Sequence, residues 1–526
     1  GDAQGGQTDL GKFSLENLQE IQFYTTGPTE ILLPARSFAT SSLLSLKTSF
    51  GNVKTKEQIV FSVGAKYGSF GYFAPTFSCK KVIGKRVQMA LNGLYQQVKS
   101  DYPFTSYENK KASERRLNSD IKSYRLEYDA AFAVNDSNKI KFKTYYSKSD
   151  RGLPGAIVLY NPISNQRLND ENLFLQSTWE NKLSSKTSLL LSTKFSFEKS
   201  FYLDPSYPND SGRLENTFHQ QEAYFSAAFK RNISKDFSLS YSSDFFSSKL
   251  KRTDVFSADF ANPNRISFLN NIALRFHRVN AELAGNILHT DLEEKVSFGK
   301  KGRSLHAFSP AISASRKPFT NLRFRFRGSY KHSLRAPTFN DLYYTNIGNA
   351  NLRPEYAEQF NLGITYNTGT NKFLKECTIT ADGYLNDVKD KILALPRQNL
   401  FQWSVQNIGV SKTLGTDAGL HFLFAEFNKL NVSGNISYSF QQARDLSDKN
   451  SARYKTQLPY VPKHSGSANF NAEYKKAVFS YNILMSSYRY RIGNPLPENI
   501  VQGWSAHDVS LSYPFLRQTT ECRIIA

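Results

Sequence analysis

The chain has 526 residues, of which 40% are hydrophobic and 14% aromatic, with 29 Tyr and 41 Phe. The low apolar content argues against a thick soluble core, and no run of about 18 apolar residues exists, which excludes transmembrane helices. The net charge of +22 comes from Lys and Arg spread over the whole chain. It therefore indicates contact with anionic lipid headgroups or an acidic partner, and not a nucleic-acid patch.

The first 50 residues differ in pattern from the rest. Residues 10–24 read as a compact αβ-like stretch, Gly27 and Pro28 follow, and Leu43–Thr48 reads as a short strand. We expect residues 1–50 to belong to a separate domain, of which they are the C-terminal part. Residues 51–526 show no linker or change in composition and are expected to form one β-domain.

From about residue 55 onward, apolar and polar side chains alternate with a period of two. In residues 322–330, three apolar side chains alternate with Arg323, Arg325 and Arg327, and residues 237–245 set four apolar side chains against three serines and Asp244. Successive side chains of a strand point to opposite faces, so each strand has one apolar and one wet face. This is typical of an all-β transmembrane antiparallel barrel, whose outside is apolar and aromatic and whose inside is polar.

About twenty such segments follow one another, and the connectors alternate between short and long. Short turns at one membrane face and long loops at the other are typical of outer-membrane barrels. A further strand begins near Thr519 and stops at Ala526, so we expect a barrel of about 22 strands whose last strands are missing. A barrel of that size is wide enough to be plugged. As given, the chain is expected not to close and to leave an unpaired edge.

Two neighbouring motifs carry a specific resemblance. SLRAPTFNDLYY at 333–344 and GNANLRPEYAEQFNLGITY at 348–366 resemble signature motifs of the TonB-dependent outer-membrane transporters. Segments 384–392, 407–420, 458–470 and 503–513 are also similar, so the resemblance covers roughly the whole barrel. FSLENLQEIQFYTTGP at 13–28 resembles the end of the family's plug domain, although residues 35–49 carry Ser and Thr where the family has glycines.

The resemblance implies a location and partners. It implies the outer membrane of a Gram-negative bacterium, a plug remnant in residues 1–50, a barrel in residues 51–526, and energy from a TonB-type periplasmic protein. Outer-membrane lipid is the second expected partner, and a surface lipoprotein is a further candidate. No cofactor is expected, since cobalt or iron would belong to the imported ligand.

The same resemblance narrows the class of ligand that the protein is expected to import. Haem receptors of the family have a histidine between the two motifs, whereas residues 338–348 contain none, and the large glycan importers are longer chains. Residues 149–170 resemble cobalamin-transporter-like receptors. We therefore expect import of cobalamin, with a ferric siderophore as the alternative, and a passive porin or adhesin as the alternative of another class.

Aromatic and amide side chains in the long loops are the candidate ligand contacts, because they combine contact area with adaptable hydrogen bonding. The alternative is that they form the aromatic girdle or pack loop on loop. The candidates are Tyr102, Tyr160, Asn161, Tyr202, Tyr207, Arg335, Asn340, Tyr343 and Tyr344.

Two charged clusters have competing interpretations. Arg323, Arg325 and Arg327 could guide an anionic solute, but we favour contacts with acidic plug residues, since a charge inside the barrel needs a partner. Asp291, Glu293 and Glu294 could bind calcium, but a solvated acidic loop is the simpler interpretation.

Nothing in the sequence indicates catalysis or a resident metal. His219, His306 and His507 lie near serines, but no nucleophile elbow is present, so we expect no enzyme activity and no catalytic residue. The histidines and the three cysteines lack metal-ligand spacing.

Overall fold

The computed structural model describes most of the chain. The described residues are 3–6, 11, 13, 18–24, 27–28, 30–48, 58–84, 86–105, 113–155, 164–207, 210–254, 259–318, 323–344, 347–368, 373–396, 403–491, 496–515 and 520–525. Among them, no helix is long and apolar enough to cross a membrane.

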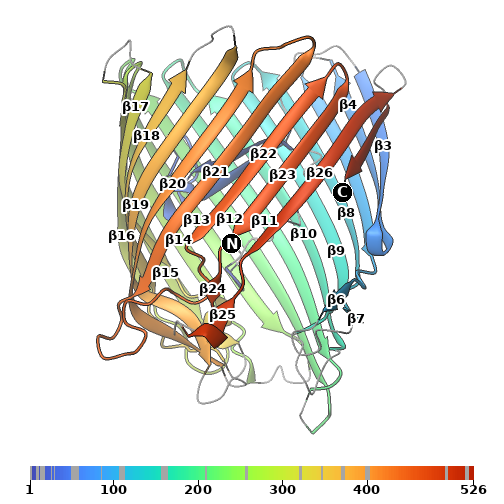
Figure 1. Ribbon diagram of the computed structural model, residues 1–526. Coiled ribbons are helices and arrows are strands. Elements are labelled where there is room, and N and C mark those ends of the chain that lie inside the picture. The colour runs from blue at the N-terminus through green and yellow to red at the C-terminus, as the bar shows by residue number, and fades with distance from the viewer. Residues whose placement is uncertain are drawn as a thin grey trace.

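The dominant feature is one closed barrel of 21 strands, in which strands that follow one another along the chain pair antiparallel (Figure 1). This confirms the predicted all-β barrel. Its strands are β3 (Gln58–Gly68), β4 (Tyr72–Ile83), β5 (Val87–Val98), β8 (Ile121–Asn135), β9 (Asn138–Leu153), β10 (Gln166–Lys182), β11 (Thr187–Asp204), β12 (Leu214–Asn232), β13 (Phe237–Arg252), β14 (Asn264–Arg278), β15 (Ala281–Lys295), β16 (Leu305–Arg316), β17 (Phe324–Arg335), β18 (Glu355–Thr368), β19 (Leu374–Pro396), β20 (Trp403–Phe424), β21 (Leu430–Asp445), β22 (His464–Tyr474), β23 (Ala477–Ser486), β26 (Trp504–Phe515) and β27 (Thr520–Ile525).

The remaining elements lie inside the barrel or in its loops. They are β1 (Leu18–Tyr24), α1 (Arg36–Ala39), β2 (Leu43–Thr48), the 3-10 turn η3 (Ser69–Gly71), β6 (Pro103–Thr105), β7 (Ser113–Arg115), α2 (Phe339–Tyr343), β24 (Arg489–Tyr490), the 3-10 turn η5 (Pro497–Asn499) and β25 (Ile500–Val501). The pairs β6–β7 and β24–β25 form small hairpins at the same end of the barrel (Figure 1).

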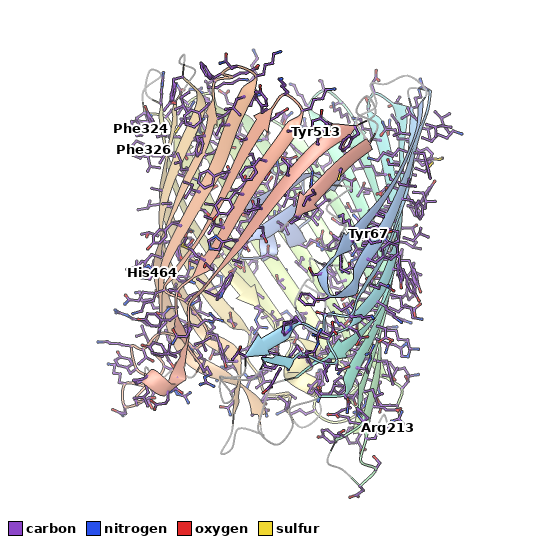
Figure 2. All side chains as sticks on the ribbon, turned by 45° about the vertical axis from the view of Figure 1, so that its right-hand side comes forward. Tyr67, Arg213, Phe324, Phe326, His464 and Tyr513 are labelled. Carbon is purple, nitrogen blue, oxygen red and sulfur yellow. The ribbon has the colours of Figure 1, made fainter. Side chains whose placement is uncertain are left out.

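The two ends of the barrel differ, as the connector lengths predict. Arg213, in a long connector, lies at one end, whereas Phe324 and Phe326 lie toward the opposite end and point away from the wall (Figure 2). In the family's barrels the long loops face the cell exterior. We refer to the end with Arg213 as the long-loop end.

The expectation that the chain would not close is wrong. β27 lies next to β3 and completes the barrel. Because the number of strands is odd and the register pairs are antiparallel, these two strands run in the same direction. Closure is favoured because an unpaired strand edge in hydrocarbon would leave backbone groups without partners.

The wall has unequal height. Strands β8 to β15 have 15 to 19 residues each, and we call them the tall arc. The low arc consists of β22, β23, β26, β27, β3, β4 and β5, with 6 to 12 residues each. Accordingly Tyr67, at the end of β3, lies only about halfway down the barrel, far from Arg213 (Figure 2).

The N-terminal residues lie inside the barrel. β1 and β2 pair as an antiparallel hairpin, and this blue part of the ribbon lies in the space that the barrel encloses (Figure 1). The strand at Leu43–Thr48 has the predicted bounds. The assignment of residues 1–50 to a plug domain and of 51–526 to the barrel stays a prediction.

The alternating arginines of β17 find their partners on other strands of the barrel wall. Arg327 on β17 pairs with Asp382 on β19 at 2.9 Å, and Gly363 of β18 lies between them in the register. A Cβ on Gly363 would lie 1.9 Å from the Asp382 carboxylate, so glycine leaves the space that this carboxylate occupies in the pair. Arg325 donates to the Ser315 hydroxyl at 2.9 Å. Both arginines thus have partners in the wall, and contacts with an acidic plug stay a prediction.

Candidate ligand-binding site

The signature motif folds as the short helix α2 in the loops of the long-loop end. Its first turn is closed by a capping box, in which the Thr338 hydroxyl accepts from the Asp341 N–H at 3.1 Å and the Asp341 carboxylate accepts from the Thr338 N–H at 2.9 Å. The sequence TFND supplies both partners three residues apart. Such a reciprocal cap satisfies two N–H groups that a helix start leaves free.

The apolar residues of α2 pack on the loops. Phe339 is fully buried with Phe218, Leu250 and Phe260, and the backbone of Ala3 lies on its start, accepting from the Phe339 N–H at 2.9 Å. On the other side, Leu342 packs into a second cluster with Leu352, Ile392 and Val405. These residues come from the ends of four strands and from two long connectors, and α2 joins them into one layer.

Arg335 holds the end of β17 to this layer. Its guanidinium lies 3.1 Å from the Asp341 carboxylate and 3.6 Å from that of Glu355. As a candidate ligand contact, it is therefore already engaged by two acids, although it remains partly exposed.

Tyr343 has a buried hydrogen-bond network. Its hydroxyl donates to the Glu294 carboxylate and accepts from the Gly302 N–H at 2.8 Å, while Arg265 lies 2.7 Å from Glu294. Burial raises the pKa of Tyr343, and the hydrogen bond to Glu294 raises it further. No sequence pattern marks Arg265, because its acidic partner lies on the neighbouring strand β15. Its guanidinium carbon also lies 4.7 Å from the centroid of the Phe339 ring, which belongs to a distant part of the chain.

The acidic cluster predicted as a loop is part of strand β15, so that prediction is wrong. Asp291 and Glu293 face outward, whereas Glu294 faces inward and is 2% exposed. Alternation therefore separates the three carboxylates, and Asp291 instead lies 2.8 Å from His306. Within the described part of the chain, no group of three or more His, Cys, Asp or Glu is placed to hold a metal ion.

Three candidate tyrosines come together beside α2. Tyr202, Tyr207 and Tyr344 are close enough to interact electrostatically. Burial raises the pKa of Tyr344, with Arg252 opposing and Tyr207 adding to the effect. Arg252 is held by Asp254 at 2.6 Å and by the Asn216 side chain at 2.6 Å. These phenols next to a fixed guanidinium can offer ring surface and hydrogen bonds to a large ligand.

The other candidates fall in different places. Asn340 lies on α2, and its N–H donates to the Gln4 carbonyl at 2.9 Å. Tyr102 lies apart, in the loop before β6. The centroid of its ring is 6.2 Å from that of Phe70 of η3. Tyr160 and Asn161 lie outside the described residues.

Deeper in the barrel, the wall holds residues 30–39. The buried Asp244 carboxylate on β13 accepts the N–H groups of Ala35 at 3.0 Å and Arg36 at 2.7 Å, and the Tyr224 hydroxyl at 3.0 Å. It thereby caps α1, whose own N-cap residue, Ala35, provides no side-chain hydrogen bond. The Arg36 guanidinium lies 4.8 Å from the Tyr224 ring centroid. We call this arrangement the Asp244 clamp.

Apolar and ionic contacts extend the clamp. Ile31 and Phe38 pack on Ala273 of β14, and Ala35 packs on Leu269 and Leu288. Toward the other end of the barrel, Glu30 lies 3.2 Å from Lys230 and 3.8 Å from Arg275. All of these wall residues belong to the tall arc.

These features agree with the family comparison. Residues 80–520 match the family described as TonB dependent receptor-like, beta-barrel. The match covers most of the chain, and the chain therefore belongs to this family, whose members are outer-membrane proteins of Gram-negative bacteria.

Curated relatives match over a short part of their length. The chain is 30% identical over 123 residues to a protein named vitamin B12 transporter BtuB of Vibrio vulnificus, covering 23% of this chain and 18% of that protein. It is 29% identical over 114 residues to the BtuB of Photobacterium profundum, covering 21% and 17%. The chain thus matches less than a fifth of the length of either relative.

Solved structures share the fold over nearly the whole chain. The copper transporter OprC has a TM-score of 0.73 at 11% identity, with 96% of this chain and 78% of that chain covered. The FrpB iron transporter of Neisseria meningitidis has a TM-score of 0.71 at 12% identity, with coverages of 95% and 80%. At these identities the likeness concerns the fold alone.

Proposed function

We propose that this chain is the barrel of an active importer that takes up a large, scarce nutrient across the outer membrane, with cobalamin as the first candidate. The observation that carries the proposal is the local identity with two proteins named vitamin B12 transporter, on a chain that belongs to the receptor family. A TonB-type protein is the proposed energy-coupling partner, and a surface lipoprotein stays a prediction.

The geometry supports import of a large ligand. A simple pore needs an open lumen, whereas here the β1–β2 hairpin and residues 30–39 lie inside the wall (Figure 1). At the long-loop end, the partly exposed Tyr202, Tyr207 and Tyr344 lie in one electrostatic neighbourhood with the fixed Arg252 guanidinium. Rigid aromatic contacts of this kind suit a macrocycle such as a corrin.

The test is equilibrium binding of cyanocobalamin and of ferric siderophores to the purified protein at nanomolar concentration. Tight cobalamin binding that weakens about tenfold or more in Tyr344→Ala, roughly the loss of one well-packed aromatic contact, supports the proposal. The matched control is Tyr102→Ala, which removes a loop tyrosine away from this group.

Two other outcomes separate the alternatives. Tight binding of a ferric chelate without cobalamin binding selects the siderophore receptor. Uptake into cells that continues after loss of the membrane potential contradicts active import and selects a passive pore. In either case, the proposal of no enzyme activity is unaffected.

A further inference from the structure

We propose that the outer face of the tall arc carries a binding site for a phosphorylated lipid headgroup, formed by Lys199, Lys249 and Lys251 with His219 between them. Lys199 belongs to β11, and Lys249 and Lys251 belong to β13. The strand between them, β12, contributes the histidine (Figure 1). The occupant is a lipid of the outer leaflet whose headgroup bears phosphate groups and several acyl chains.

The register brings the cations into one row. Lys199 is paired with His219, and His219 is paired with Lys251, so the three side chains lie directly side by side. With strands about 4.8 Å apart, the row spans roughly 10 Å. Lys249 lies one step below on the same face, opposite Gln221. Such a row can contact more than one phosphate oxygen of a single headgroup.

Strand alternation fixes the direction of these side chains. Lys199 has the same parity as the exposed Phe195 and Phe197, while the alternate residues Ser192 and Ser196 are buried on the inner side. Likewise Lys249 and Lys251 are exposed, whereas Leu250 and Arg252 are buried. The row is therefore on the membrane side of the wall, near the long-loop end.

An aromatic strip lies on the same face, nearer the middle of the strands. Phe195, Phe225, Phe245 and Phe268 form a continuous series with centroid distances of 5.4, 6.3 and 5.2 Å. The row lies four to six residues farther along each strand, which is roughly 13–20 Å at about 3.3 Å per residue. Cations above an apolar aromatic band match a lipid with anionic headgroup and acyl chains below it.

The three lysines have no ion pair within the described residues. Glu171 is the register neighbour of Lys199, but its carboxylate accepts the Tyr146 hydroxyl at 2.9 Å. On β15, the outward Asp291 lies 2.8 Å from His306. The Tyr146 hydroxyl does not neutralise Glu171, so three lysines beside one carboxylate leave an excess of two positive charges for a partner outside the chain.

A second row at a comparable position offers a contrast. On the outer face of β18 to β21, the register neighbours are, in order, Glu358, Asp387, Lys412 and Arg444. Lys412 lies 3.6 Å from Asp387, and Lys389 lies one step along β19 on the same face. This row combines acids and bases that neutralise one another. Because it has lysines at the same membrane face without the excess charge, it provides the matched control.

The experiment measures binding of bis-phosphorylated lipid A to the full chain in detergent, by native mass spectrometry. The test variant combines Lys199→Ala, Lys249→Ala and Lys251→Ala, and the control combines Lys389→Ala, Lys412→Ala and Arg444→Ala. At about fivefold per lysine near a charged lipid, the test variant is expected to bind roughly 100-fold more weakly. The control, which removes the same number of cations, is expected to change binding less than about threefold, because its row is already neutralised.

Three further arms make the result decisive. Dephosphorylated lipid A is expected to bind the unaltered protein as weakly as the test variant does, and millimolar inorganic phosphate is expected not to compete. The heat-dependent gel mobility of folded barrels checks each variant, and the single change Lys251→Ala, with roughly fivefold weaker binding, replaces the triple variant if the latter does not fold. Equal losses in test and control, or binding that does not depend on the lipid phosphates, would overturn the proposal.

Discussion

The tall and low arcs of the barrel differ in what they hold. Residues 30–39 are attached to the tall arc by a buried carboxylate, two apolar clusters and an ion pair. In the low arc, β3 is exposed along residues 59–68, and β27 closes the wall with only six residues. The difference indicates that the internal segment is fixed to one side of the wall, while the other side is the weakly paired part of the barrel.

The largest expected effect comes from breaking the Asp244 clamp. Asp244→Ala leaves two main-chain N–H groups and the Tyr224 hydroxyl without their acceptor. We expect residues 30–39 to lose about 3 kcal/mol of attachment, which is roughly a 100-fold rise in local opening. Hydrogen exchange of a peptide covering residues 30–39 measures it.

The control for the clamp lies in the low arc. Ser78→Ala removes the hydrogen bond from Ser78 to Asn92 at 2.7 Å, which does not involve the internal segment. Exchange of residues 30–39 should be unchanged in this variant. If Asp244→Ala exchanges no faster than Ser78→Ala, the tall arc does not hold the segment through this carboxylate.

The clamp also shows what sequence patterns can predict. Alternation in residues 237–245 placed Asp244 on the wet face with three serines, and the structure confirms that it faces inward. Its partners, the N–H groups of Ala35 and Arg36, lie about 200 residues away in the chain. A period of two gives the face of a residue but not what lies opposite it, so the barrel was predictable and the clamp was not.

The same limit explains the other differences. Strand lengths and connector parity predicted the barrel, but closure depends on β27 meeting β3 across the whole sheet. At the candidate site, the SLRAPTFNDLYY motif marked the segment that contains α2 but did not predict the helix itself. Glu294 was expected in a solvated loop because the end of β15 could not be read from composition. Contacts between strands that are far apart along the chain leave no pattern in the sequence of either strand.

The second prediction concerns the loop layer attached to the tall arc. Tyr343→Phe removes the hydroxyl that joins α2 to Glu294 on β15 and to the Gly302 N–H. We expect a loss of about 2 kcal/mol in the attachment of α2, since a bond to a buried carboxylate is among the stronger ones. Hydrogen exchange of residues 336–344 should then rise roughly 30-fold.

Its control is the same chemical change beside the low arc. Tyr102→Phe keeps the ring that contacts Phe70, and the phenol of Tyr102 makes no side-chain hydrogen bond to the described residues. Its effect on exchange in residues 336–344 should be negligible. Similar exchange in both variants would mean that Tyr343 does not anchor the layer.

The third prediction compares thiols in two parts of the wall. Cys522 lies exposed on β27 of the low arc, whereas Cys377 is buried on β19, the longest strand. In detergent, single-cysteine variants should react with a maleimide on the order of ten times faster at Cys522, because its thiol is exposed whereas that of Cys377 is accessible only after local opening. Equal rates would contradict the better protection of the wall at β19.

The smallest effect is expected for the ion pair of Glu30 with the tall arc. Burial raises the pKa of the Glu30 carboxyl, but the Lys230 ammonium and Arg275 outweigh it, so the pKa lies below its ordinary value of 4.5. The attachment is therefore complete above that value and is lost as the pH falls through the lowered pKa. Because Glu30 is half exposed, Glu30→Gln should raise the exchange of residues 30–39 at neutral pH only a few-fold.

The matched control is Glu20→Gln, which breaks the exposed pair of Glu20 with Lys47 inside the β1–β2 hairpin. Among the described residues, the polar partners of the Glu20 carboxylate are Lys47 and Gln22, both in this hairpin. It should leave exchange of residues 30–39 unchanged at every pH. In the unaltered protein, acidification should raise the exchange of residues 30–39 as much as Glu30→Gln does at neutral pH. In the Glu30→Gln variant, acidification should cause no further rise. A pH effect of equal size in both proteins would assign the acid sensitivity to another group, and the attachment of residues 30–39 would then depend on the Asp244 clamp and its apolar clusters alone.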